Sequence, residues 1–135
     1  MVDILRPDAI QSRSELYAKT QDGRDLYIGA GWVLFGLKGS PGGGWNYRDL
    51  RFDVGPQWRN TPEPEIVPTV ALASIMNSGV ATNAGWAIDD CAVEFTQPLD
   101  QLSRRCQLVC RIAVRDADGI MYRATYHVAM LGQLR

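Results

Sequence analysis

The residue types best suited to chemistry are scarce in this chain. It contains three cysteines, Cys91, Cys106 and Cys110, and one histidine, His127. Any Ser-His-Asp or Cys-His site would have to use His127, and no Gly-x-Ser-x-Gly motif accompanies it. A histidine on the exposed face of a strand is therefore the favoured interpretation. The sequence predicts a protein that is not an enzyme.

A zinc site built from these four residues is disfavoured by their spacing. Cys106 and Cys110 lie in or beside a predicted strand, where positions i and i+4 are about 13 Å apart. Two thiolates at that separation cannot share one zinc ion, with bonds of about 2.3 Å, unless a bulge or turn brings them together. Cys91 and Cys110 are expected to be small core residues. A Cys91–Cys106 disulfide is the alternative if the strands that carry these two residues are neighbours. We expect no metal and no cofactor.

Length and composition indicate one folded domain. The chain has 135 residues, of which 46% are hydrophobic, and 14 basic side chains stand against 15 acidic ones. This balance disfavours a nucleic-acid binder, which usually carries a basic excess. No run of about 18 apolar residues is present, so no membrane span is expected. No Sec-type signal peptide is recognised at the start, so reduced cysteines after cytoplasmic synthesis are the default, while the final location is left open.

Alternation of apolar and polar residues predicts about six strands. The first, Leu26–Leu37, is so rich in apolar residues that it is expected to be buried on both faces. In Arg48–Val54 the apolar residues point one way and the charged residues the other. Pro68 places the third strand at a sheet edge or at a strand start. This third strand is Ile66–Ile75, and a loop over Gly55–Pro64 is expected before it. The later strands are Trp86–Thr96, Gln107–Arg115 and Ile120–Leu131. In Trp86–Thr96, Asp90 and Glu94 lie on the face opposite Cys91, Val93 and Phe95.

The last two strands are predicted to form a hairpin around Asp116-Ala117-Asp118-Gly119, because glycine suits the last position of a three-residue loop. The expected register pairs apolar with apolar or aromatic residues, namely Val114 with Tyr122, Ile112 with Ala124, Cys110 with Tyr126 and Leu108 with Val128. It buries Tyr126 and places Arg111 and His127 on the opposite, exposed face.

The expected fold is an all-β antiparallel β-sandwich of about six strands, with a small β-barrel as the alternative. Residues 23–135 would form this single domain, which begins after a turn at Gln21-Asp22-Gly23. Residues 1–22 are expected to be either an extended N-terminal arm or a short helix. The helix would cover Ser12–Lys19, where Ser12 and Glu15 have the spacing of a capping box.

Aromatic residues beside loops rich in glycine and proline are the most suggestive candidates for binding. Trp45, Tyr47 and Trp58 lie in or next to such loops. A sugar site combines aromatic rings, which cover apolar CH faces, with polar groups that bind hydroxyls. The alternative is that the tryptophans close the ends of the sandwich.

Several short motifs resemble those of H-type lectin domains. Leu50-Arg51-Phe52, a loop rich in proline and the strand Val67–Ile75 are similar to the first half of such a domain, and Gly31-Trp32 is similar to an early Gly-Trp. Near the end, the similar features are Arg111, the hairpin Gly119 and Thr125-Tyr126-His127. The similarity covers about residues 30–130, discontinuously. Asp49 is the candidate for the acidic ligand that the family carries in an early loop.

The resemblance implies a six-stranded antiparallel sandwich, a trimeric assembly and binding of sugars of the N-acetylgalactosamine type. Arg111, Tyr126 and His127 would contact the sugar. The leading hypothesis is therefore a non-enzymatic, carbohydrate-binding module that acts as a homo-oligomer. The alternative is a structural or assembly subunit, of a virion, a tail or a secretion apparatus, that uses its sheets for self-association. The candidate ligand-binding residues are Arg111, His127, Tyr126, Trp45, Tyr47 and Asp49.

Overall fold

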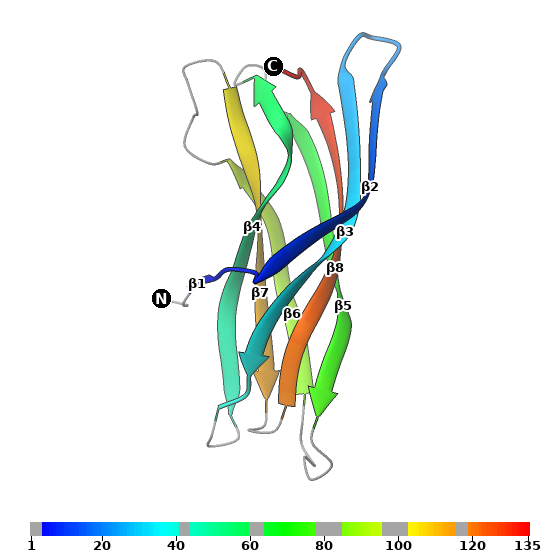
Figure 1. Ribbon diagram of the computed structural model, residues 1–135. Coiled ribbons are helices and arrows are strands. Elements are labelled where there is room, and N and C mark those ends of the chain that lie inside the picture. Colours follow the sequence, from blue (N-terminus) through cyan, green and yellow to red (C-terminus); the bar gives the residue numbers. More distant parts are fainter. Residues whose placement is uncertain (1–3, 41–43, 60–63, 78–84, 96–102, 116–118) are drawn as a thin grey trace.

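The computed structural model describes residues 4–40, 44–59, 64–77, 85–95, 103–115 and 119–135. Within these ranges the chain forms eight strands and no helix (Figure 1). They are β1 (Ile4–Leu5), β2 (Ala9–Lys19), β3 (Asp25–Lys38), β4 (Trp45–Arg59), β5 (Glu65–Asn77), β6 (Gly85–Phe95), β7 (Ser103–Arg115) and β8 (Gly119–Gly132).

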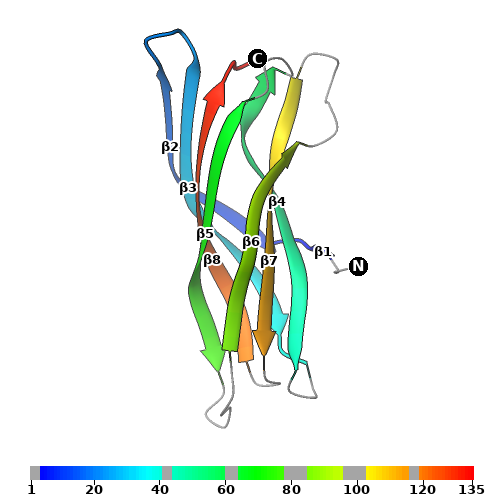
Figure 2. The same ribbon diagram turned by 180° about the vertical axis from the view of Figure 1, so that it is seen from behind.

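The strands form two four-stranded sheets that face each other, so the predicted all-β sandwich is confirmed. Sheet A has the order β1-β4-β7-β6, and sheet B has the order β2-β3-β8-β5 (Figures 1 and 2). Strand β1 pairs with β4 in parallel, and every other strand pairing is antiparallel. The described part of the chain has eight strands where about six were expected, because β1 and β2 belong to the sandwich.

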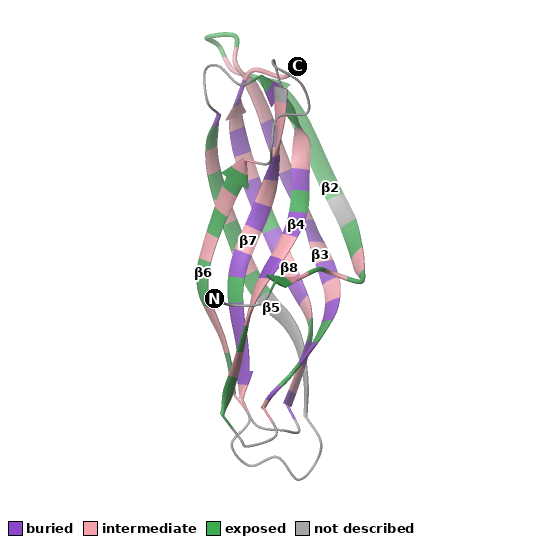
Figure 3. Ribbon diagram, turned by 90° about the vertical axis from the view of Figure 1, so that its left-hand side faces the viewer, coloured by how far each residue is buried: buried purple, intermediate pink, exposed green. Residues whose placement is uncertain are grey.

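The core lies between the sheets and consists of residues that alternate along each strand. On β4, Leu50, Phe52 and Val54 are buried, whereas Arg51 and Asp53 face outward. This confirms the faces that alternation predicted for this strand. The same inward alternation runs along β3, β7 and β8, where buried and less buried residues follow each other (Figure 3). Strand β5 lies at an edge of sheet B, as Pro68 predicted.

For the N-terminal segment the sequence left an extended arm and a short helix open, and the helix over Ser12–Lys19 is wrong. Residues 9–19 instead form β2, which pairs along its length with β3 in an antiparallel hairpin. The predicted turn at Gln21-Asp22-Gly23 closes this hairpin, and Gly23 has a φ of 84°, a region that glycine adopts without steric cost. A strand is favoured here because its pairing with β3 provides backbone partners that an isolated helical turn lacks.

The predicted pairing of the last two strands is wrong. Strand β7 lies between β4 and β6 in sheet A, whereas β8 lies between β3 and β5 in sheet B. The apolar faces of β7 and β8 therefore meet across the core rather than as neighbours in one sheet. The turn residues 116–118 lie outside the described residues. The prediction that Tyr126 is buried is nevertheless confirmed, since it is only 7% exposed.

The position of Trp58 also differs from the prediction. The segment from Gly55 to Pro64 was expected to be a loop, but β4 continues to Arg59 and Trp58 is fully buried. Gly55 has a φ of 74°, and the pairing of β4 with β7 shifts register between Val54 and Trp58. This irregularity precedes the buried indole. Trp58 is thus a core residue and not an exposed loop aromatic.

Candidate functional site

The outer face of sheet A carries polar and aromatic side chains side by side. Since Leu50, Phe52 and Val54 point into the core, the residues between them on β4 point outward. The outward series on β4 is Trp45, Tyr47, Asp49, Arg51 and Asp53. Three of these, Trp45, Tyr47 and Asp49, were predicted from the sequence as binding residues.

The first part of this face is aromatic. Trp45 and Tyr47 are 38% and 41% exposed, and their ring centroids lie 6.3 Å apart. The guanidinium of Arg115 lies over the Trp45 ring, 5.2 Å from its centroid. The residues beside the two rings on the neighbouring strands are small. Ala113 lies opposite Tyr47, and a Cβ on Gly85 would lie only 3.3 Å from the indole of Trp45. The two rings, tilted by 40° to each other, therefore form an exposed aromatic patch.

The second part of this face is a charged cleft of about 200 Å³. Arg111 on β7 lies opposite Asp49 on one side and Asp90 on the other, and its Nε is 3.4 Å from Asp49 Oδ1. Next to it, Arg51 Nη1 lies 2.9 Å from Glu94 Oε2. The polar lining consists of Asp49, Arg51, Asp90, Glu94 and Arg111, and Ala92 and Val109 complete the cleft.

A bulge in β6 brings Asp90 to this cleft. The pairing of β6 with β7 shifts between Ile88 and Asp90, so that Ile88 lies opposite Ile112 and Asp90 lies opposite Arg111. One inserted residue changes which side chains share a face. Beyond the bulge, Cys91 and Val93 pack against the core while Asp90 and Glu94 are exposed, as alternation predicted.

The structure brings four of the six predicted binding residues to one face and separates the other two. Tyr126 belongs to the core, where its ring makes an edge contact with Phe52 at a centroid distance of 5.3 Å. His127 is exposed on the outer face of sheet B, where it lies opposite Ala30 and Thr69. Arg111 and His127 therefore lie on opposite faces of one chain and cannot contact the same sugar there.

Three cleft residues, Arg51, Asp90 and Glu94, were not predicted as binding residues. Alternation did place Asp90 and Glu94 on the outward face of their strand. What the sequence does not give is that β4 and β6 both flank β7, which brings the outward residues of all three strands together.

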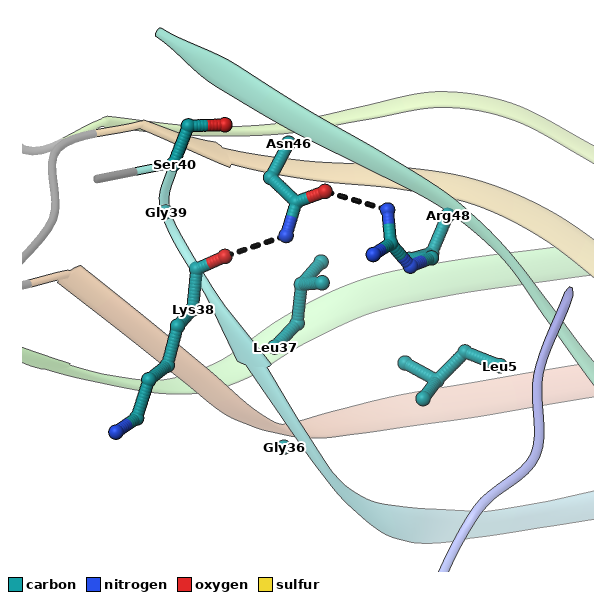
Figure 4. Close-up of a pocket in the computed structure, with 8 residues that line it drawn as sticks. All are labelled: Leu5, Gly36, Leu37, Lys38, Gly39, Ser40, Asn46 and Arg48. Carbon is teal, nitrogen blue, oxygen red and sulfur yellow. Dashed lines mark hydrogen bonds between the residues drawn. The ribbon is translucent and has the colours of Figure 1, made fainter. Parts of the chain in front are cut away.

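A larger cavity, of about 520 Å³, lies near the end of β3 and the start of β4 (Figure 4). The amide nitrogen of Asn46 donates to the carbonyl of Lys38 at 2.6 Å, and Arg48 donates to the side-chain oxygen of Asn46. In Figure 4 the amino group of Lys38 points away from Asn46 and Arg48. The polar groups that line this cavity thus mainly bind one another, and none of the six predicted residues lies in it.

The cysteines are free thiols, and the adjacent pair differs from the one considered from sequence. Cys91 lies directly opposite Cys110, whereas Cys106 lies opposite Phe95. Burial raises the pKa of Cys106 to about 12. A hydrogen bond from the Cys110 thiol lowers the pKa of Cys91, and the same bond with burial raises the pKa of Cys110. Across the residues described, no group of three or more His, Cys, Asp or Glu side chains is arranged to hold a metal ion.

The fold and the outer face of sheet A define a β-sandwich with a mixed aromatic and charged surface. Comparisons of the chain with models of protein families, with curated proteins and with solved structures found no match. Within the described ranges, no helix has the length and hydrophobicity that a membrane span requires.

Proposed function

We propose that this protein is a non-enzymatic carbohydrate-binding module whose site is the outer face of sheet A. The observation that carries the proposal is the continuity of two exposed rings, Trp45 and Tyr47, with a cleft lined by carboxylates and guanidinium groups. Exposed rings can cover the CH faces of a sugar, and carboxylates and guanidinium groups can bind its hydroxyls.

The charges of the cleft favour a neutral ligand with many hydroxyl groups. Three carboxylates, Asp49, Asp90 and Glu94, share the cleft with two guanidinium groups. This near balance offers no excess of positive charge for a phosphate or a polyanion. Paired carboxylates and guanidinium groups still accept and donate hydrogen bonds, and together they match the donors and acceptors of sugar hydroxyls.

Part of the resemblance to H-type lectins supports this proposal. Arg111 and Asp49, both named by the resemblance, lie together in the cleft. The proposed site nevertheless differs from the one that the resemblance implies, because Trp45 and Tyr47 replace Tyr126 and His127 as its other members.

A glycan-array screen followed by titration calorimetry tests the proposal. Tyr47→Ala and Arg111→Ala are each expected to weaken binding at least about 10-fold, equivalent to about 1.4 kcal/mol. Tyr122→Ala is the matched control, because Tyr122 is 39% exposed against 41% for Tyr47 but belongs to sheet B. An array without binding, or an equal loss in the Tyr122 variant, would overturn the proposal.

The second candidate is a structural or assembly subunit. One observation favours it, namely the large apolar area on the outer face of sheet B, where Leu16 and Val67 are 52% and 65% exposed. An array without binding, together with an assembly that forms without any ligand, would favour this candidate over the first.

A further inference from the structure

The outer face of sheet B is mostly apolar, and its apolar residues lie on all four strands. Strand register aligns Leu16 on β2, Ile28 on β3, Ala129 on β8 and Val67 on β5 in one row. The adjacent row, nearer the β2–β3 turn, consists of Ala18, Leu26, Leu131 and Glu65. We call this surface, with the further rows that follow it, the sheet B face.

Two further rows extend the sheet B face toward the other end of the strands. The first consists of Ser14, Ala30, His127 and Thr69. The second consists of Gln11, Trp32, Thr125 and Ala71. Glu65 and His127 are the only ionisable side chains in these four rows, and every other position is apolar, aromatic or neutral polar.

The sequence of β3 is typical of a strand that is covered on both sides, but the described residues cover only its inner side. Its inward residues, such as Tyr27 and Val33, are buried between the sheets. Its outward residues Leu26, Ile28 and Trp32 are only partly buried. Strand β2 is exposed along most of its length (Figure 3). Apolar patches of this kind on a soluble domain mark interaction sites.

We propose that a second copy of this chain covers the sheet B face, so that two molecules stack with sheet B against sheet B. Two identical twisted sheets have the same hand and can pack face to face with strands aligned to within about 30°. A twofold axis pairs this face with itself, which is the commonest arrangement in homo-oligomers. Because Glu65 and His127 are the only ionisable groups in the four rows, few like charges would oppose such a contact.

The extent of the face fits a dimer. Four strands spaced about 4.8 Å apart, over the nine residues that the four rows and the next row, that of Arg123, span with a rise of about 3.3 Å, give a projected area of roughly 570 Å². Side-chain relief adds to this projection, so the surface removed from water approaches the roughly 800 Å² per partner of a standard interface.

Charge complementarity selects one orientation of the two copies. Counted from the β2–β3 turn, Glu65 stands in the first row of the face. Arg123 stands in a fifth row, next to that of Trp32, where it lies opposite Leu34 and over the ring of Trp32. A twofold axis that runs across the strands through the row of His127 exchanges the first and fifth rows. It therefore brings Arg123 of each copy near Glu65 of the other, on adjacent strands. A twofold axis along the strands would instead place each row opposite the same row of the other copy. Arg123 and Glu65 would then stay apart.

This inference does not rest on carbohydrate binding, because the two faces lie on opposite sides of the sandwich. Stacking through sheet B leaves both copies of the sheet A face pointing outward. If the sheet A face binds sugar, the dimer would present two sites to a multivalent surface, and avidity would strengthen weak binding.

The test is the mass of the protein in solution, measured by light scattering after size-exclusion chromatography and by sedimentation over a range of concentrations. We expect a species of twice the 15.0-kDa chain mass. Leu16→Lys should weaken the dimer at least about 100-fold, because a symmetric interface receives the buried charge twice. Tyr17→Lys is the matched control, since Tyr17 is also 52% exposed but points to the opposite side of β2.

Val67→Lys, at the far edge of the same face, gives a second independent result, and circular dichroism verifies that each variant is folded. A monomeric wild type at about 100 µM overturns the proposal. So does a dimer that survives both Leu16→Lys and Val67→Lys, or one that Tyr17→Lys disrupts equally in the folded state. Sugar binding by a monomer would leave the proposed function intact while refuting the dimer.

Discussion

The two facing thiols of sheet A, Cys91 and Cys110, lead to a prediction about oxidation. They lie directly opposite each other on antiparallel strands. Residues so placed have Cα atoms about 4.5–5.5 Å apart, within the range of about 4.4–6.8 Å that disulfides span. Oxidised glutathione should therefore convert the pair into a disulfide, with release of two molecules of reduced glutathione.

Cys91 is the thiol expected to react first. It is only partly buried and lines a cleft of about 300 Å³ between β5 and β6, whereas Cys110 is fully buried. The hydrogen bond from Cys110 lowers the pKa of Cys91, which favours the thiolate that attacks the glutathione disulfide. Cys110 then displaces the second glutathione from the mixed disulfide.

The expected gain in stability follows from the loop that the bond closes. The disulfide encloses about 20 residues, for which the loss of chain entropy in the unfolded state corresponds to about 3 kcal/mol. With a urea dependence of about 2 kcal/mol per molar, the midpoint of unfolding should rise by about 1.5 M. Strain in the bond would reduce this value.

The assay compares two variants that each retain two thiols. Cys106→Ala leaves Cys91 and Cys110, and it should lose both free thiols on oxidation and gain stability in urea. Cys110→Ala leaves Cys91 and Cys106, which are not opposite each other, and it should form no intramolecular disulfide. A disulfide in the second variant but not in the first would refute the strand register from which the prediction was derived.

Two further predictions concern the hairpin of β2 and β3. Gly29→Ala should cost about 2 kcal/mol, because the new Cβ would lie 2.8 Å from Cζ and 2.9 Å from Cε1 of Tyr27; urea unfolding should show that this cost disappears in a Tyr27→Ala background. Asp25→Ala should cost about 1 kcal/mol at pH 7, because the Asp25 carboxylate accepts hydrogen bonds from Leu134 N and Lys19 Nζ at 2.9 Å each. The Leu134 hydrogen bond is the main cause of the lowered pKa of Asp25, so the stabilisation is present above the unfolded pKa of about 3.9 and is lost as pH falls through the lower folded value. Thermal melts from pH 7 to pH 2 should therefore show wild type and variant converging in acid, and a constant difference would contradict this assignment.

The sequence predicted the direction in which side chains point better than it predicted strand partners. Alternation correctly placed Leu50 and Phe52 inside and Arg51 outside, because period two alone determines the face. It could not determine the partner of β7, since apolar residues match equally well across a core and between neighbouring strands. Seven of the eight apolar residues of the expected hairpin do lie in the core between the sheets, whereas Tyr122 is 39% exposed. A self-consistent register is therefore no proof of pairing.

The candidate site shows the same division between local and global information. Trp45, Tyr47 and Asp49 share one face because β4 begins at Trp45. The predicted strand began at Arg48 and left Trp45 and Tyr47 beside a loop. Arg111 joins them only because β7 is the neighbour of β4. Trp58 was misplaced because the segment rich in proline that follows Gly55 suggested a loop, although register and burial keep it in the strand.

The contrast between the two outer faces connects the proposals. Both sheets cover the same core, so the inner faces of both must be apolar. Each outer face can have its own composition. Along β4 the outer positions are aromatic and charged, and along β3 they are Leu26, Ile28, Ala30, Trp32 and Leu34. Exposure of the second set to water has a cost of about 25 cal/mol per Å² of apolar surface, which a charged surface does not incur. A partner that removes this cost must itself be apolar and similarly shaped, and a second sheet B face meets both conditions.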